Sequence, residues 1–255
     1  MPYAEIARGD LFYTLGRGPV DAPTLVLVHG AGGTHLHWPA ELRRLSGATV
    51  YTLDLPGHGR SRGEGCDTIE GYAEAVDAFL HAVGIERAVI VGHSMGGAVA
   101  MTLALDFGCV AGLVLVGTGA RLRVAPAILE GIRSDFAGSV EIITRFAWSP
   151  ETPQKLTELG RQALLKTGPD VLVGDFAACN RFDVMERLRE IQVPTLVVTG
   201  SVDQLTPVKY ARFLTESVSG ARLTTIEGAG HMVMLEQPVG VEKTVREFLE
   251  DIQSG

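Results

Sequence analysis

Four short apolar runs constrain the fold of this chain more than any other feature of its sequence. They are rich in valine and leucine, and they occupy residues 24–28, 88–91, 112–116 and 195–198. Polar and apolar residues do not alternate within them, as they would in a strand with one exposed face. Continuous apolar runs of this length are typical of parallel strands that are covered by helices on both faces.

Helical patterns fall between these runs. They cover residues 68–83, 94–107, 207–217 and 239–252. The first has its apolar residues on one stripe, with the period of an amphipathic helix, and the second is apolar nearly all round. Further strands are expected at residues 50–53 and 222–226, and a hairpin at residues 3–7 and 11–15. Strands that alternate with helices predict an α/β fold with a doubly wound, mostly parallel sheet.

The alternation breaks between residues 118 and 192. This segment has no strong strand run, and Gly138, Ser149-Pro150 and Gly168-Pro169 interrupt its helical patterns. The expected helices cover residues 125–136, 140–148, 153–166 and 170–188. A helical insertion of this length is more than a simple crossover between parallel strands. We therefore predict a core domain of residues 1–117 and 193–255, with residues 118–192 inserted as a helical cap over one end of the sheet.

The composition argues against several classes of protein. The chain of 255 residues carries a net charge of −8 and no basic stripe, so we expect no nucleic-acid partner. Its first ten residues contain no apolar signal segment, and no apolar run is long enough to span a membrane. Three scattered cysteines argue against a disulfide framework or a cysteine metal site. We expect a cytoplasmic protein without membrane insertion, and the sequence leaves its oligomeric state open.

A G-x-S-x-G pentapeptide, Gly92-His93-Ser94-Met95-Gly96, stands between the apolar run at 88–91 and the helical pattern that follows. In this context the serine occupies a strained strand-to-helix turn, and its hydroxyl projects above the end of the sheet. Glycine is needed on both sides because a Cβ would collide with the bent chain. The alternative is a glycine-rich turn with an incidental serine, but the context favours a nucleophile.

A serine nucleophile needs a base within reach, and the base needs an acid that orients it. His231 follows the strand expected at 222–226, on a loop with two glycines, and is the candidate base. Asp203 follows the strand at 195–198 and is the candidate acid, although turn and capping roles are common for aspartate. The rival acids are Glu227, which has little reach, and Asp54 and Asp106, which also end elements. The chain order serine, aspartate, histidine is typical of G-x-S-x-G hydrolases.

Two backbone amides are candidates for an oxyanion hole. The N–H of Met95 directly follows the proposed nucleophile and opens a helix, where N–H groups have no helical partner. The second donor is expected in the glycine-rich loop at residues 29–33, with Ala31 as the first choice and Gly32 as the alternative. A phosphate-binding loop is excluded because no Lys-Ser or Lys-Thr follows these glycines.

Taken together, these segments resemble the α/β-hydrolase superfamily. The resemblance rests on residues 29–33, 92–97, 200–203 and 230–231 and on the stretch Asp54-Leu55-Pro56-Gly57-His58-Gly59-Arg60-Ser61. It implies the α/β-hydrolase fold, Ser94 as nucleophile, Asp203 as acid, His231 as base, and a cap inserted after the strand that ends near Val116. Members with serine at this position include carboxylesterases, monoacylglycerol lipases, enol-lactone hydrolases and C–C bond hydrolases. Serine in place of aspartate argues against dehalogenase or epoxide hydrolase chemistry.

We predict a serine hydrolase that cleaves small to medium hydrophobic carboxylic esters through an acyl-enzyme intermediate, without a metal or an organic cofactor. The alternatives are an enol-lactone or C–C bond hydrolase with the same triad and, from another class, a non-catalytic ligand receptor on this fold. Candidate pocket residues are Gly32, His93, Phe136, Phe146, Trp148 and Met232, with Trp38, Phe176 and Met185 as further aromatic or sulfur side chains. At helical spacing the apolar ones could equally form the core of the cap. His35 and His37 lack a carboxylate or cysteine at ligand spacing, so we expect no metal there.

Overall fold

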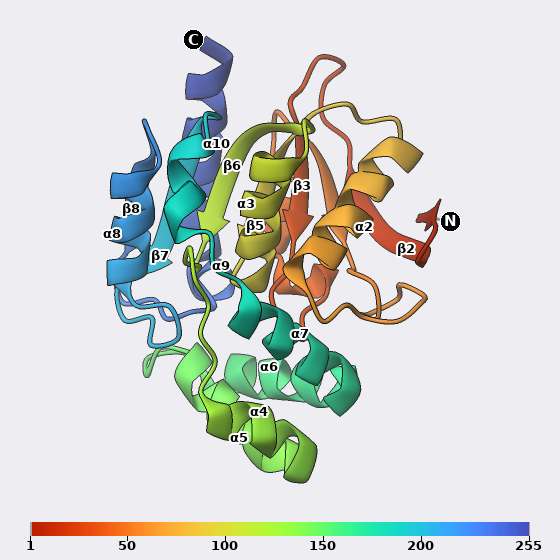
Figure 1. Ribbon diagram of the computed structural model, residues 1–255. Coiled ribbons are helices and arrows are strands. Elements are labelled where there is room, and N and C mark those ends of the chain that lie inside the picture. Colours follow the sequence, from red (N-terminus) through yellow and green to blue (C-terminus); the bar gives the residue numbers. More distant parts are fainter. Residues whose placement is uncertain (1, 255) are drawn as a thin grey trace.

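The computed structural model describes residues 2–254 and contains an eight-stranded sheet with strand order β1-β2-β4-β3-β5-β6-β7-β8 (Figure 1). The strands are β1 (Tyr3–Ile6), β2 (Gly9–Gly16), β3 (Thr24–Val28), β4 (Thr49–Leu53), β5 (Ala88–His93), β6 (Val110–Val116), β7 (Thr195–Gly200) and β8 (Arg222–Ile226). β2 pairs antiparallel with β1 and β4, and the other pairs are parallel. The predicted mostly parallel sheet and amino-terminal hairpin are confirmed.

Helices cover both faces of this sheet, as the apolar runs predict. The helices of the core are α1 (Ala40–Arg43), α2 (Ile69–Ala82), α3 (Met95–Asp106), α8 (Val208–Ser217), α9 (Val233–Glu236) and α10 (Pro238–Ser254). α2, α3 and α8 pack on one face, and α1 and α10 pack on the other. Every residue of β5 and β7 is buried, which explains why these strands carry no alternating polar positions.

The segment between β6 and β7 forms a group of helices beyond the carboxyl ends of the central strands (Figure 1). They are α4 (Pro126–Ser134), α5 (Phe136–Ala147), α6 (Gln154–Thr167) and α7 (Pro169–Arg181). The 3-10 helix η2 (Met185–Glu190) follows α7 but packs with the core beside α8 and is not one of them. A small apolar cluster of Ile132, Val140, Ile143 and Leu172 joins α4, α5 and α7. We refer to these helices as the cap; its boundaries at residues 118 and 192 stay a prediction.

Two cap helices differ from their predicted ranges. α5 begins at Phe136 instead of Val140, because the Asp135 side chain accepts a hydrogen bond from the Gly138 N–H and caps the helix four residues earlier than the glycine suggested. The helix predicted for residues 170–188 ends at Arg181, since Phe182 is extended and Asp183 forms an isolated bridge with Arg121. A separate 3-10 turn then begins at Met185.

Candidate active site

Ser94 lies at the junction of β5 and α3 in a strained backbone conformation. Its φ of 52° is the only positive value at a non-glycine residue within residues 2–254. A Cβ on Gly92 would lie 2.1 Å from the carbonyl oxygen of Gly96, and one on Gly96 would lie 2.2 Å from that of Val28. Both glycines are therefore required by close backbone approach, and together they permit the sharp turn that presents the Ser94 side chain.

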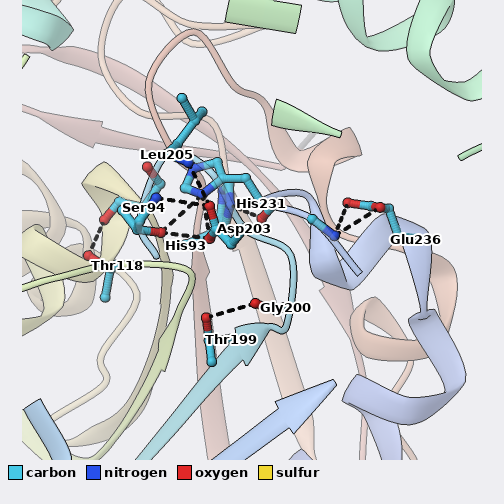
Figure 2. Close-up of polar contacts among 11 residues, drawn as sticks. His93, Ser94, Thr118, Thr199, Gly200, Asp203, Leu205, His231 and Glu236 are labelled. Carbon is cyan, nitrogen blue, oxygen red and sulfur yellow. Dashed lines mark hydrogen bonds and ion pairs between the residues drawn. The ribbon is translucent and has the colours of Figure 1, made fainter. Parts of the chain in front are cut away.

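Asp203 and His231 form a buried pair at the ends of two neighbouring strands (Figure 2). The Nδ1 atom of His231 lies 3.0 Å from Oδ2 of Asp203. The other carboxylate oxygen, Oδ1, accepts hydrogen bonds from the backbone N–H groups of Leu205 and Thr206, both at 2.9 Å. Burial alone would raise the pKa of Asp203, but the His231 ring and these hydrogen bonds outweigh it and lower that pKa. Asp203 is therefore ionised and can orient the imidazole.

Two residues that the sequence analysis missed support this pair. The Thr206 hydroxyl donates to Oδ2 of Asp203 at 2.7 Å and lies 3.1 Å from Nδ1 of His231. Glu236 accepts the N–H groups of Gly230 at 3.1 Å and Ser149 at 3.0 Å, so it ties the loop before His231 to the cap. The spacing of Asp203 and Thr206 is a local sequence signal of a turn in which the two side chains meet. The sequence around Glu236 contains no comparable signal of its contacts.

The rival acids face other partners. Glu227 accepts a hydrogen bond from the hydroxyl of Ser201 at an exposed position. Asp54 is buried and accepts from the His35 N–H and the Arg60 N–H, so it holds the turn that follows β4. Asp106 pairs with Arg187 at the surface. Asp54 thus has a structural role in that turn, and Asp203 is the carboxylate that contacts His231.

His93, the residue before Ser94, also contacts His231. Its Nε2 lies 3.0 Å from the carbonyl oxygen of His231 and donates to it. Burial and the nearby His231 ring lower the pKa of His93 well below 6.5, so the ring is neutral, and its Nδ1 has no partner in the described chain. His29 also bonds to backbone, with Nδ1 donating to the Gly30 carbonyl at 2.8 Å. Both histidines thus bond to backbone carbonyl groups.

The Gly30–Gly33 turn follows β3 and faces the start of α3. Two of its N–H groups are engaged: Gly33 N–H donates to the Gly30 carbonyl at 3.0 Å, and Gly32 N–H donates to Asp175 at 2.7 Å. The N–H of Ala31 has no acceptor among residues 2–254, and the same holds for the N–H of Met95 at the first position of α3. Two unengaged donors near Ser94 can receive a developing oxyanion. Gly32, the alternative donor, is occupied by Asp175.

Ser94, His231 and Ala31 line one cavity of about 350 Å³ between the core and the cap. Its walls are mostly apolar side chains, including Leu36, Ile143, Leu156, Leu164, Leu205 and Leu235. Of the predicted pocket residues, His93, Trp148, Met232 and Phe176 line this cavity. His93 belongs to β5, Trp148 directly follows α5, Phe176 belongs to α7, and Met232 lies in the loop after β8. The cavity therefore joins Ser94 and His231 to an apolar compartment that is large enough for a small molecule.

The other predicted pocket residues lie away from this cavity. Gly32 packs against the side chains of Leu164 and Leu172. Phe136 packs against the apolar cluster that joins α4, α5 and α7. Phe146 is 41% exposed, because α5 turns Ile143 and Ala147 toward the cavity and only one stripe of a helix can face inward. Trp38 is fully buried on the face of the sheet that α1 and α10 cover. Met185 packs against the apolar cluster on the other face, which α2, α3 and α8 cover. Periodicity identifies a buried stripe without showing which cavity it faces.

No group of three or more His, Cys, Asp or Glu side chains in residues 2–254 is arranged to hold a metal ion, and His35 bonds to Asp54 at 2.8 Å. None of the helices in this range combines the length and apolar character needed to cross a membrane.

Comparison with known proteins agrees with this geometry. The chain matches the alpha/beta hydrolase family over residues 25–244 and belongs to that family. Pimeloyl-acyl-carrier-protein methyl ester esterase of Sodalis glossinidius is 32% identical over 248 residues, which cover 90% of this chain and 94% of that protein. The solved structure of a thermophilic esterase is 35% identical, with a TM-score of 0.86 over 98% of this chain and 97% of that one. The enol-lactonase from Burkholderia xenovorans LB400 is 25% identical, with a TM-score of 0.90 over 98% and 100%. The protein is thus an esterase-like hydrolase of this family.

Proposed function

We propose that this protein is a serine esterase that cleaves small to medium hydrophobic carboxylic esters through an acyl-enzyme intermediate. One observation carries the proposal: Ser94 and the hydrogen-bonded Asp203–His231 pair meet at the wall of a single, mostly apolar cavity. The unengaged amides of Ala31 and Met95 lie at the same end of the sheet. These are the groups that acyl transfer requires.

In the proposed mechanism, Nε2 of His231 takes the proton of the Ser94 hydroxyl as its oxygen attacks the ester carbonyl carbon. The carbonyl oxygen becomes an oxyanion, which the N–H groups of Ala31 and Met95 stabilise. The tetrahedral intermediate collapses, the C–O bond to the alcohol breaks, and His231 protonates the departing alcohol. Water then loses a proton to His231 and attacks the acyl-enzyme, which releases the acid and restores Ser94. Asp203 holds the tautomer and stabilises the imidazolium in both halves.

The charge of the cavity favours neutral substrates. Among the described residues that line it, there is no lysine or arginine, and the polar side chains are Ser94 and the histidines His37, His93 and His231. Burial lowers the pKa of His37 to about 4 and that of His93 well below 6.5, so neither supplies a positive charge near neutral pH. A substrate with a free carboxylate would have to give up its hydration without a cation in return.

The second candidate is hydrolysis of an enol-lactone or a C–C bond by the same groups. The likeness to the Burkholderia enol-lactonase favours the lactone. The absence of a cation from the cavity lining argues against lactones or diketones that carry a carboxylate, and leaves the neutral ones. A receptor without catalysis does not need a serine and a hydrogen-bonded Asp–His pair at one cavity, so we rank it below both.

Two measurements test the proposal. A fluorophosphonate probe should label the wild-type protein at Ser94, and labelling should be lost in Ser94→Ala but kept in the surface control Ser201→Ala. Hydrolysis of p-nitrophenyl esters should be fastest for short and medium acyl chains, and a half-ester with a free carboxylate should react far more slowly than its neutral methyl diester. A folded protein without labelling would support the receptor. Preference for long chains or for the charged half-ester would contradict the proposed substrate class.

A further inference from the structure

Asp175, on cap helix α7, is a fully buried carboxylate outside the reacting groups. Three donors from three separate segments of the core converge on it. The Gly32 N–H lies 2.7 Å and Nε2 of His58 lies 2.8 Å from Oδ2, while the Tyr72 hydroxyl lies 2.5 Å from Oδ1. Burying a carboxylate is costly unless it is paired and hydrogen-bonded. This one is paired and bonded entirely by groups of the core, so it joins the cap to the core at one point.

His58 supplies the opposite charge. Its Nδ1 lies 2.9 Å from the Pro56 carbonyl oxygen and its Nε2 faces the carboxylate, so both ring nitrogens meet acceptors and both carry protons. Burial alone would lower the pKa of His58, but the Asp175 charge and the hydrogen bonds outweigh it and raise that pKa. The two residues therefore form a buried ion pair whose carboxylate still accepts the Gly32 N–H.

The Gly32 hydrogen bond selects one conformation of the Gly30–Gly33 turn. Gly32 has a φ of +65° at the third position of a turn that is closed by the bond from Gly33 N–H to the Gly30 carbonyl. Positive φ at this position is the mark of a type II turn, and the alternative type I turn has the peptide between Ala31 and Gly32 reversed. In the reversed form the Gly32 N–H would turn away from Asp175. The carboxylate therefore stabilises the observed turn against its commonest alternative.

The cap holds the other polar group of Gly32 as well. The hydroxyl of Thr167, at the end of α6, donates to the Gly32 carbonyl at 2.8 Å. Side chains from the same two cap helices pack against Gly32, since a Cβ there would lie 2.6 Å from Leu164 and 2.9 Å from Leu172. The N–H of Ala31, one residue earlier, is left unengaged, and Ala31 lines the cavity beside Ser94.

We infer that Asp175 is a positioning residue for the oxyanion hole: by holding the Gly32 N–H it fixes the position of the Gly30–Gly33 turn, and with it the position of the neighbouring Ala31 N–H beside Ser94, and it makes that position depend on a docked cap. The inference rests on the proposed serine-esterase function. Asp175 contacts no substrate in this scheme. It acts through Gly32, and its effect should therefore fall on the transition state and not on binding of the ground-state ester.

The test compares two variants that remove different contacts of the same carboxylate. Asp175→Ala removes the acceptor of the Gly32 N–H, and we expect kcat for a p-nitrophenyl ester to fall roughly 10- to 100-fold, because losing a whole oxyanion donor costs about 10²- to 10³-fold. KM should stay within about threefold, and a trifluoromethyl ketone that forms a tetrahedral adduct should lose affinity by the same factor as kcat. Tyr72→Phe removes a bond to Oδ1 and leaves Gly32 untouched, so its kcat should stay within about threefold of wild type.

Asp175→Asn separates the hydrogen bond from the charge. The amide oxygen can still accept the Gly32 N–H while the amide nitrogen faces the Tyr72 oxygen, so most of the lost kcat should return. If Asp175→Ala does not fold, the same comparison uses Thr167→Val, which removes the bond to the Gly32 carbonyl and should lower kcat at unchanged KM. Circular dichroism and thermal unfolding report folding in each case.

Several results would overturn the inference. Equal losses of kcat in Asp175→Ala and Tyr72→Phe would mean that the cluster only stabilises the fold. A loss confined to KM, or a trifluoromethyl ketone affinity that does not follow kcat, would separate Asp175 from the oxyanion. Each of these results would leave the proposed function intact, since wild-type hydrolysis would still depend on Ser94. A wild-type protein without Ser94-dependent hydrolysis would refute the proposed function, and this inference with it.

Discussion

Replacing Asp203 with asparagine should block catalysis without disturbing the fold, and the structure predicts how. Oδ1 of Asp203 accepts two backbone N–H groups, from Leu205 and Thr206, each at 2.9 Å. In Asp203→Asn the amide oxygen must keep that place, because the amide nitrogen is only a donor. The nitrogen then replaces Oδ2, which lies 3.0 Å from Nδ1 of His231. Nδ1 is forced to accept, and the single proton of the neutral ring moves to Nε2.

An imidazole with its proton on Nε2 cannot take a proton from Ser94. The same loss in a serine hydrolase triad lowers kcat by about 10⁴, which corresponds to about 5 kcal/mol of transition-state stabilisation. We expect a drop of this order for Asp203→Asn at neutral pH, with little change in KM, since the cavity walls are untouched. The thermal unfolding midpoint should remain close to that of the wild type, because the two backbone bonds to Oδ1 are kept and the Thr206 hydroxyl can turn to accept from the amide nitrogen.

The assay is steady-state hydrolysis of p-nitrophenyl butyrate together with the rate of fluorophosphonate labelling, and both should fall together. Thr206→Val is the matched control. It removes the hydroxyl that contacts Oδ2 of Asp203 and Nδ1 of His231 but leaves the carboxylate in place, so its kcat should stay within about tenfold of wild type. If folded Asp203→Asn kept kcat within a factor of ten of the wild type, the tautomer argument and the role of Asp203 would both be wrong.

Two predictions concern stability. Gly96→Ala should destabilise the fold by several kcal/mol and abolish labelling, because the new Cβ would lie 2.2 Å from the Val28 carbonyl oxygen, whereas Gly108→Ala, with no atom within 4 Å, should be nearly neutral in urea unfolding. Burial lowers the pKa of His37 to about 4, so between pH 6.5 and 4 the unfolded state binds a proton that the folded state does not. The free energy of unfolding should therefore decrease as the pH falls through that range, by up to about 3 kcal/mol from this residue. His37→Gln should show a shallower decrease in urea titrations than the wild type, and the exposed control His81→Gln should not; equal slopes in all three proteins would refute the assignment.

The parts of the site that the sequence predicted best are local. Ser94 stands between an apolar strand and an apolar helix that are contiguous in the chain, so one segment contains its own context. Asp203 and His231 each follow a strand of a parallel sheet, and the carboxyl ends of such strands share one edge. Once the strands were identified, the topology brought the segments together with no knowledge of side-chain directions.

The parts that the sequence could not predict depend on contacts between distant segments. Asp175 lies 143 positions after Gly32 and 117 after His58, and one aspartate on a helix gives no sign that it faces inward. Phe146 carried the same apolar signal as Trp148, yet one is at the surface and the other lines the cavity. The phase of a cap helix relative to the core decides such outcomes, and that phase is fixed by packing between elements.

Stability alone explains the Asp175–His58 pair poorly. Both side chains are fully buried, and a buried ion pair commonly gains nothing over apolar residues of the same volume, because desolvation of the charges offsets their attraction. An apolar pair of that size would fill the same space between α7 and the core. It could not accept the N–H of Gly32, and the turn would then lose the contact that favours its observed form. The pair is therefore better explained by the backbone group that it holds than by the energy that it contributes, and that backbone group lies one residue from the amide proposed to meet the oxyanion.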